Sequence, residues 1–204
     1  MSKKASGANL SKREQLRAER RRRSLVWNVI LLGGGGLALL AVIAYLVATA
    51  RPGALTDEKL ILDEGKAHVN SSVGVKPQYS HYPPSSGTHY GDQVAPWGVY
   101  AEPIEEGVFV HNLEHGGVVF LYYCDEPCPD LERQFDDLYK KAPPARPFTT
   151  VKILVTPYDK AKMPKPIVAL AWDHELDMDK FDEATMLQWY KRFVNLGPEG
   201  SQLP

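Results

Sequence analysis

Apolar and polar positions divide the chain into three zones. Residues 25–49 form an uninterrupted run of twenty-five residues without a charged side chain. Residues 70–107 follow no sustained period and are rich in Gly, Pro, Ser and Tyr. From residue 108 onward, short apolar runs alternate with stretches of helical period, a pattern typical of a folded domain that contains both strands and helices.

The apolar run at 25–49 predicts a transmembrane helix. At about 1.5 Å per residue, a helix of this length spans roughly 37 Å, which is enough to cross a bilayer with some tilt. Arg20 to Arg23 directly precede the run, and the positive-inside rule then predicts a cytoplasmic amino end and an extracytoplasmic carboxyl end in the cell membrane. A signal peptide cleaved after Ala50 is the alternative, although the run is longer than a signal peptide needs.

The pattern beyond residue 50 predicts an α+β domain, with a small mixed or antiparallel sheet and with helices packed on one face. Pro129 suits the first turn of a helix, and the apolar residues that follow it fall on one helical face. The expected elements are a short helix at Thr56–Lys66, strands at Val108–Val110, Val118–Tyr123, Val151–Val155 and Ile167–Trp172, and helices at Pro129–Lys141 and Phe181–Val194.

The aromatic residues within 70–107 argue against disorder, since disordered segments are poor in such residues. We therefore expect an ordered loop region wrapped on the core, and long ordered loops in compact domains are commonly functional. The expected domain boundaries are a basic cytoplasmic tail at 1–24, a transmembrane helix at 25–49, a linker with the short helix at 50–66, and an extracytoplasmic domain at 67–204.

Charge separates the amino end from the rest of the chain. Residues 1–24 carry nine Lys/Arg and two Glu, a net charge of +7, whereas residues 51–204 carry fifteen Lys/Arg and twenty-three Asp/Glu, a net charge of -8. An acidic domain repels phosphates, so we expect no nucleic-acid partner. The basic tail suits an anionic membrane surface. The sequence indicates neither a protein partner nor an oligomeric state.

Candidate chemistry gathers in the run His-Asn-Leu-Glu-His-Gly-Gly at 111–117. His111, Glu114 and His115 fit the H-x-x-E-H pattern of inverted zincins, in which a helix brings both imidazoles to one metal ion. Val108–Val110 predicts a strand, however, and the two glycines end any helix. At most one helical turn is therefore expected here, which disfavours the inverted-zincin interpretation.

The first interpretation of this run is a metal site that is built on a turn and does not need a helix. A turn can point His111 and His115 the same way, with His89 or His68 as a third ligand and Glu114 as a ligand or an orienting group. Neutral imidazole is a common nitrogen ligand of Zn and Cu. Two alternatives stay open: a hydrolase, with or without a metal, in which Glu114 or a histidine is the general base, and a polar network that serves only the fold or a protein interaction.

Cys124 and Cys128 are the only cysteines and are spaced C-x-x-x-C. Outside the cytoplasm such a pair favours a disulfide. A thiolate pair that binds Cu(I) is the alternative. The two histidines at positions 81 and 174 are expected to be surface loop residues.

Four motifs occur together in one order: PPSSGTHY at 83–90, WGVY at 97–100, VHNLEHG at 110–116 and ALAW at 169–172. This set resembles the bacterial family catalogued as domain of unknown function 3105, from about His68 to the carboxyl end. The resemblance implies a membrane-anchored extracytoplasmic domain and a shared site, but it carries no reaction with it. The site residues that it implies are His89, His111, Asn112, Glu114 and His115.

Overall fold

The computed structural model describes residues 12–200 and divides the chain into two compact units, Met1–Ala50 and Arg51–Pro204. The first unit contains α1 (Lys12–Thr49), which is charged in its first part and apolar in its second. Within the described residues, no helix is both long enough and apolar enough to cross a membrane, so the transmembrane helix predicted at 25–49 is not supported. Residues 1–11 of the predicted basic tail lie outside the described residues.

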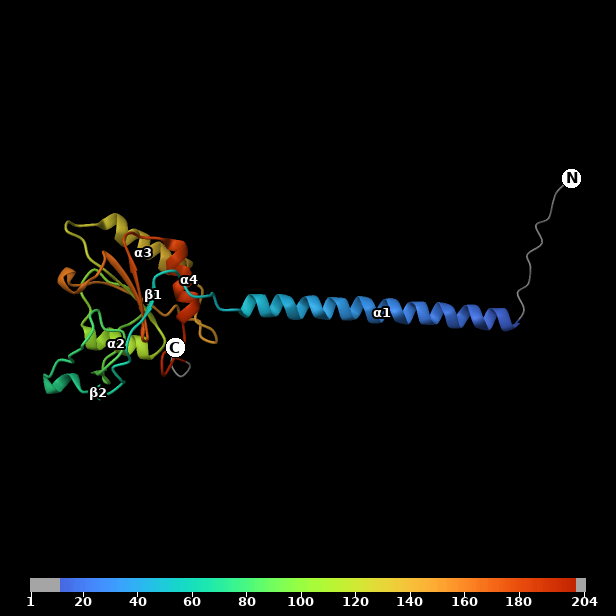
Figure 1. Cartoon of the computed structure of the whole chain (residues 1–204), viewed down its shortest axis with the longest axis horizontal. Helices are drawn as coiled ribbons and strands as arrows, with labels where there is room; N and C mark the ends of the chain where they lie inside the picture. Colours follow the sequence, from blue (N-terminus) through green and yellow to red (C-terminus); the bar gives the residue numbers. More distant parts are fainter. Residues whose placement is uncertain (1–11, 201–204) are drawn as a thin grey trace. The chain divides into compact units, whose positions relative to one another are not determined.

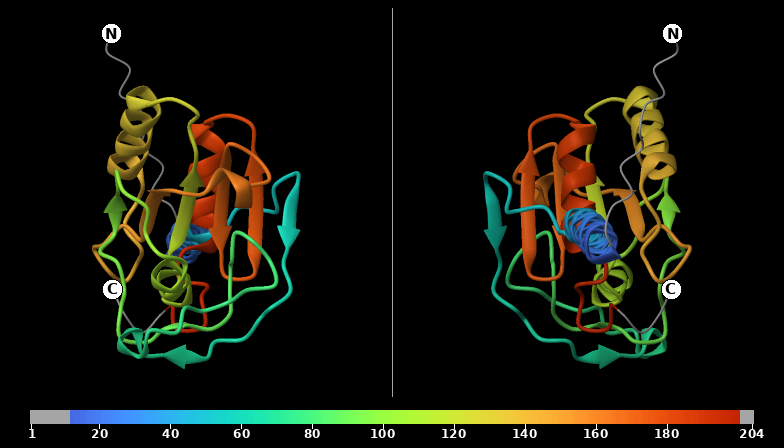
Figure 2. Two further views of the ribbon diagram at one scale, coloured as in Figure 1. Left: turned by 90° about the vertical axis from the view of Figure 1, so that its left-hand side faces the viewer. Right: turned by 90° about the vertical axis from the view of Figure 1, so that its right-hand side faces the viewer.

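The second unit is built on a six-stranded mixed sheet with the strand order β1-β8-β7-β5-β6-β4 (Figure 2). At its centre, β5 runs parallel to β6 and antiparallel to β7. A separate pair, β2 and β3, runs parallel. The strands are β1 (Glu58–Leu60), β2 (His68–Val69), β3 (His89–Tyr90), β4 (Gly98–Val99), β5 (Val118–Tyr122), β6 (Ile153–Pro157), β7 (Ile167–Ala171) and β8 (His174–Met178). Two short 3-10 turns are η1 (Ser71–Val73) and η2 (Lys160–Lys162).

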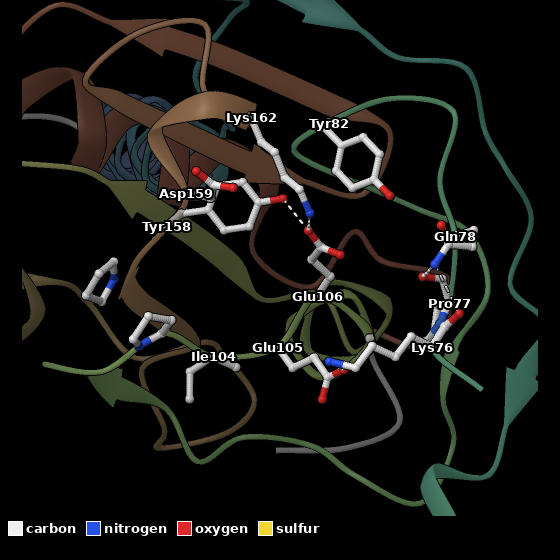
Figure 3. A pocket seen from close by; sticks show the side chains of 13 residues that line it. Lys76, Pro77, Gln78, Tyr82, Ile104, Glu105, Glu106, Tyr158, Asp159 and Lys162 are labelled. Atoms are coloured by element: carbon white, nitrogen blue, oxygen red, sulfur yellow. Dashed lines mark hydrogen bonds and ion pairs between the residues drawn. The ribbon is translucent and has the colours of Figure 1, made fainter. Parts of the chain in front are cut away.

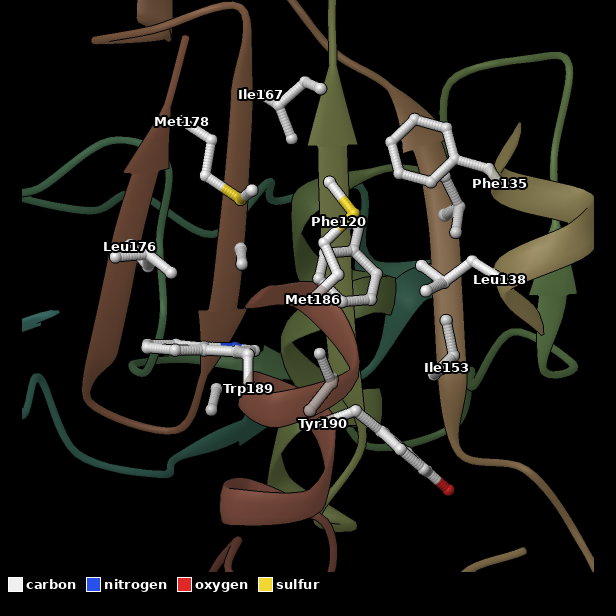
Figure 4. Packing of buried hydrophobic residues seen from close by; sticks show 14 of the residues in the cluster. Phe120, Phe135, Leu138, Ile153, Ile167, Leu176, Met178, Met186, Trp189 and Tyr190 are labelled. Atoms are coloured by element: carbon white, nitrogen blue, oxygen red, sulfur yellow. The ribbon is translucent and has the colours of Figure 1, made fainter. Parts of the chain in front are cut away.

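Two helices cover one face of the sheet. They are α3 (Pro129–Lys141) and α4 (Glu183–Phe193), and Figure 4 shows their apolar side chains directed at the strands. Phe120 of β5 and Trp189 of α4 are fully buried in this core. Burying a side chain of this size stabilises a fold by about 1.5–3 kcal/mol, so this layer is a main source of stability.

A third helix, α2 (Glu106–Glu114), packs on the opposite face of the sheet (Figure 1). Phe109 and Leu113 of α2 lie in one buried cluster with Val119 and Leu121 of β5. The prediction of helices on a single face is therefore wrong. The physical reason is that all five residues of β5 are apolar and buried, and because side chains alternate along a strand, both faces need a cover.

Several predicted elements are confirmed. α3 has the predicted bounds, and β5, β6, β7 and α4 each lie within two residues of the predicted ones at both ends. The amino-terminal cap of α4 is Asp182, whose side chain accepts a hydrogen bond from the Thr185 N–H. The segment 70–107 is ordered and largely irregular, as expected.

Three other predictions are wrong. The strand expected at Val108–Val110 lies inside α2, because packing of Phe109 and Val110 into the core overrides their local preference for a strand. The segment Thr56–Lys66, expected to be a short helix, contains no helix: β1 within it pairs with β8, and the remainder is turn or irregular. His174 lies in β8 and is only half-buried, so it is not a loop residue.

Two glycines join α2 to β5. Gly116 has a φ of 73°, a left-handed conformation that favours glycine. A Cβ on Gly117 would lie 2.4 Å from the Trp97 ring and 2.8 Å from the Asn112 carbonyl oxygen. The junction therefore fits only without a side chain, and it brings the end of α2 directly onto the start of the central strand.

We expect Gly117→Ala to lower the free energy of unfolding by about 1–3 kcal/mol, because the added methyl group overpacks this junction. Urea denaturation of the full chain measures the change. Gly53→Ala is the matched control, since a Cβ there would meet no atom within 4 Å. Equal midpoints for the two variants would contradict the packing argument.

Candidate metal centre

Three segments far apart in the sequence meet beside α2. The helix carries His111 and Glu114 three residues apart, so both side chains project from one side. His68 of β2 and His89 of β3 are paired in register and come from the small parallel sheet. One ligand atom from each of these four side chains lies within 4.8 Å of every other.

The Glu114 carboxylate lies between two of the histidines. Its Oε2 atom is 3.0 Å from His68 Nε2 and 3.0 Å from His89 Nε2. Burial alone would raise the pKa of Glu114, but the hydrogen bonds from His68 and His89 and their charge outweigh burial and hold that pKa below its usual value. The carboxylate is therefore ionised at neutral pH, although its side chain is only 1% exposed.

Two backbone carbonyls fix the orientation of the buried imidazoles. His89 Nδ1 is 2.8 Å from the Gly87 carbonyl oxygen, and His111 Nδ1 is 2.7 Å from that of Gln93. A carbonyl oxygen only accepts, so both Nδ1 atoms carry the hydrogen and donate it. In a neutral ring, Nε2 then holds the lone pair. Metal-binding histidines are commonly oriented by such a hydrogen bond on their other nitrogen.

This arrangement has a consequence at His89. Its Nδ1–H is committed to Gly87, so in a neutral ring its Nε2 lone pair faces the ionised oxygen of Glu114 at 3.0 Å. Two electron-rich atoms repel at this distance, in a site where His89 is fully buried. A positive species is needed between them, either a proton on Nε2 or a metal ion.

His115 lies outside this group of four. Its Nε2 is 2.9 Å from His111 Nε2, so one ring donates to the other. Since the His111 Nδ1–H is committed to a carbonyl, a neutral His111 accepts and His115 donates. Burial, and after it the neighbouring His111, lowers the pKa of His115 and favours its neutral form. In that tautomer His115 Nδ1 carries no hydrogen. This agrees with the structure, in which that atom is buried and has no hydrogen-bond partner in the described part of the chain.

Of the five sequence-predicted ligands, the structure thus brings together His68, His89, His111 and Glu114, and His115 contacts this group through His111 Nε2. Only one of the four is open to solvent: the side chain of His68 is 46% exposed. A hollow of about 350 Å³ lies beside it and is lined by His68, Val69, Asn70, Gly91 and Asp92.

The carboxyl end of α2 is held by a turn near the end of the chain. The Glu199 N–H donates to the Glu114 carbonyl, and the Asn195 N–H donates to the Gly116 carbonyl. The buried Lys152 ammonium donates to the carbonyls of His115 and Gly200, at 2.9 and 3.0 Å. A positive charge at the carboxyl end of a helix is favourable, so these contacts stabilise the end of α2 that carries His111 and Glu114.

Asn112 fastens a loop that sequence reasoning did not connect with the site. Its side chain is fully buried, and it accepts from the Ala95 N–H at 3.0 Å and donates to the Ala95 carbonyl at 2.8 Å. Ala95 lies two residues beyond Gln93, whose carbonyl orients His111. The roles of Gly87 and Gln93 carry no sequence signal, because every residue has a carbonyl.

The other candidate residues have separate roles. Cys124 and Cys128 form a disulfide, which confirms that prediction and excludes the thiolate pair proposed for Cu(I). His81 is not a free surface residue, since its Nε2 lies 2.6 Å from the buried Glu175 carboxylate. That pair joins the segment before β3 to β8, away from the four ligands.

A family model described as "Protein of unknown function (DUF3105)" matches residues 68–203, more than half of the chain. The chain belongs to this family. The match begins at His68 and so includes all four members of the cluster, which confirms the resemblance drawn from the sequence motifs. No curated protein and no solved structure matches the chain. The family description assigns no activity.

We expect Asn112→Ala to lower the free energy of unfolding by about 2–5 kcal/mol, because it leaves the Ala95 N–H and carbonyl buried without partners, each at a cost of about 1–3 kcal/mol. Urea denaturation measures this loss. Asn70→Ala is the control, since Asn70 is exposed and caps only η1. A loss no larger than that of the control would contradict the anchoring role.

Proposed function

We propose that this DUF3105 domain binds one divalent transition-metal ion through His68, His89, His111 and Glu114. The observation that carries the proposal is the buried contact between His89 Nε2 and Glu114 Oε2, where a positive species is required. A metal ion satisfies His89 and Glu114 together, and it binds His111 Nε2 once the hydrogen bond that His115 donates to that atom is broken. The orienting carbonyls of Gly87 and Gln93 support the proposal, because they hold the hydrogen on Nδ1 of His89 and His111 and leave Nε2 as the atom that can bind an ion.

Three imidazoles and one carboxylate favour Zn²⁺ or Cu²⁺ among the transition metals. This donor set contains no thiolate or thioether, the soft ligands that select Cu(I). Zn²⁺ is commonly four-coordinate, and a site in which all four ligands come from the protein leaves no position for a substrate. The donor set therefore supports a role in holding a metal ion more than a role in metal-dependent hydrolysis.

The hydrolase alternative is weaker for a second reason. The helix that an inverted zincin needs is present, contrary to the sequence expectation. In that chemistry, however, His111 and His115 both bind the metal and Glu114 stays free as a base. Here Glu114 contacts two imidazoles, and His115 Nε2 is hydrogen-bonded to His111 Nε2. This geometry favours Glu114 as a ligand.

Titration of the full chain, treated with a chelator and then freed of it, tests the proposal. We expect one equivalent of Zn²⁺ or Cu²⁺ to bind and, at about 100 times Kd, to raise the free energy of unfolding by about 2.7 kcal/mol. His89→Ala should weaken binding by more than about 100-fold, since even residues that only orient ligands contribute about 10–100-fold. His81→Ala, a histidine outside the cluster, should bind normally. Absence of stoichiometric binding by the unmodified chain would refute the proposal.

The alternative of a purely structural polar network predicts a different pattern. In that case His111→Ala lowers stability by the same amount with and without added metal. Metal binding predicts instead that the difference between His111→Ala and the unmodified chain grows as Zn²⁺ is added, because only the unmodified chain gains binding energy. Thermal denaturation of both proteins over a range of Zn²⁺ concentrations separates the two cases.

An extracytoplasmic location is also part of the proposal. The Cys124–Cys128 disulfide supports it, since disulfides persist in oxidising compartments. We expect these cysteines to resist alkylation in cells lysed in the presence of an alkylating agent, and to react only after reduction. Mass spectrometry of the labelled chain measures this, and full labelling of Cys124 without reductant would place the domain in a reducing compartment.

A further inference from the structure

A hollow on the described part of the domain lies at the amino end of α2, and none of the four candidate metal ligands lines it. It has a volume of about 540 Å³, within the range of small-molecule sites, and Figure 3 shows its lining side chains. Two tyrosines, Tyr82 and Tyr158, come from the loop before β3 and the segment after β6. Apolar contact area also comes from Pro77, Pro103, Ile104 and Pro157.

An ammonium group already occupies the polar part of this hollow. Lys162 Nζ lies 4.5 Å from the centre of the Tyr82 ring and 2.6 Å from Glu106 Oε1 (Figure 3). The Tyr158 ring centre is 6.0 Å away, and the Tyr158 hydroxyl donates to the same Glu106 oxygen at 2.6 Å. An aromatic face combined with a carboxylate is the arrangement that proteins use to bind organic cations.

The titration states of these groups agree with that role. The hydrogen bond to Glu106 is the main cause that raises the pKa of Lys162, so its ammonium stays charged. Burial, followed by Glu106, raises the pKa of Tyr158, so its hydroxyl stays protonated and donates. Both Lys162 and Tyr158 use Glu106 Oε1, and Oε2 takes part in neither contact.

The lining carries an excess of negative charge. Lys76 pairs with Glu105 at 3.2 Å, and Lys162 pairs with Glu106. Asp159 is the remaining charged residue of the lining, so a charge of about one unit stays unbalanced. Its Oδ1 accepts from the Ala161 N–H, and this contact leaves the ionic charge in place. An anionic ligand would meet this excess, whereas a cation that replaces the Lys162 ammonium leaves the charge balance unchanged.

We propose that this hollow binds a small organic ammonium ion with an apolar body, whose charged group takes the position between Tyr82 and Glu106 that Lys162 Nζ now fills. Lys162 is 38% exposed and belongs to a short surface turn, so its side chain can leave for solvent when a ligand ammonium takes over its ion pair with Glu106. Lys162 therefore competes with the ligand from within the same chain. The proposal does not depend on metal binding.

Titration of the full chain with phenethylammonium, followed by NMR or calorimetry, tests this site. We expect phenethylammonium to bind at least ten times more tightly than phenethyl alcohol, its neutral counterpart of similar shape. Equal affinity for the two compounds, or absence of binding by both, would overturn the proposal.

Lys162→Met supplies the sharpest variant, because it removes the competing ammonium and should increase the affinity for phenethylammonium several-fold. Damage to the fold cannot produce such a gain. Glu106→Gln should reduce the affinity about tenfold, and Glu126→Gln, an exposed carboxylate outside the hollow, should leave it unchanged. Weaker binding by Lys162→Met would also overturn the proposal. His89→Ala should bind phenethylammonium normally, so failure of the metal centre and failure of this site are separable.

Discussion

The arrangement of the domain depends on the contacts that the buried Glu114 carboxylate makes with His68 and His89. This carboxylate is a charged group in a nearly dry environment, and such a group is stable only if its partners surround it. Its partners, His68 and His89, come from the small parallel sheet, whereas Glu114 itself comes from the last turn of α2. The carboxylate therefore fixes the irregular segment before residue 107 onto the helix, and through the helix onto the central sheet.

That dependence explains why a long segment with little regular structure is ordered. Between β2 and α2, few backbone hydrogen bonds between strands hold the chain in place. Polar contacts to α2 take their place: His89 reaches Glu114, Gln93 accepts from His111, and Ala95 is bound at both its N–H and its carbonyl by Asn112. The run at 111–117, which holds most of the candidate site residues, therefore also anchors the loop region to the domain. A metal ion would reinforce a set of contacts that already exists.

The sequence predicts some of this architecture well and some of it poorly, for physical reasons. Pro129 and the apolar stripe behind it are local signals, so the bounds of α3 are predictable. α2 is not, because Val108–Val110 prefers a strand by itself and becomes helical only when Phe109 and Leu113 have a sheet to pack on. The four candidate ligands are visible in the sequence as residue types. The carbonyls that orient them are not, and neither is the placement of His115, which depends on the rotation of one helical turn.

The hydrogen bonds at the carboxyl end of α2 restrict how this domain can be shortened. The first candidate ligand in the chain is His68, while Glu199 and Gly200 hold the helix end that presents Glu114 and His115. Segments from the two ends of the family match therefore converge on one place. Deleting the last ten described residues would remove none of the four candidate ligands. It would, however, free the helix end, strip the buried Lys152 ammonium of an acceptor and take Phe193 of α4 out of the core. A shortened version kept only to residue 190 should consequently lose the cluster as a whole and not merely part of its surroundings.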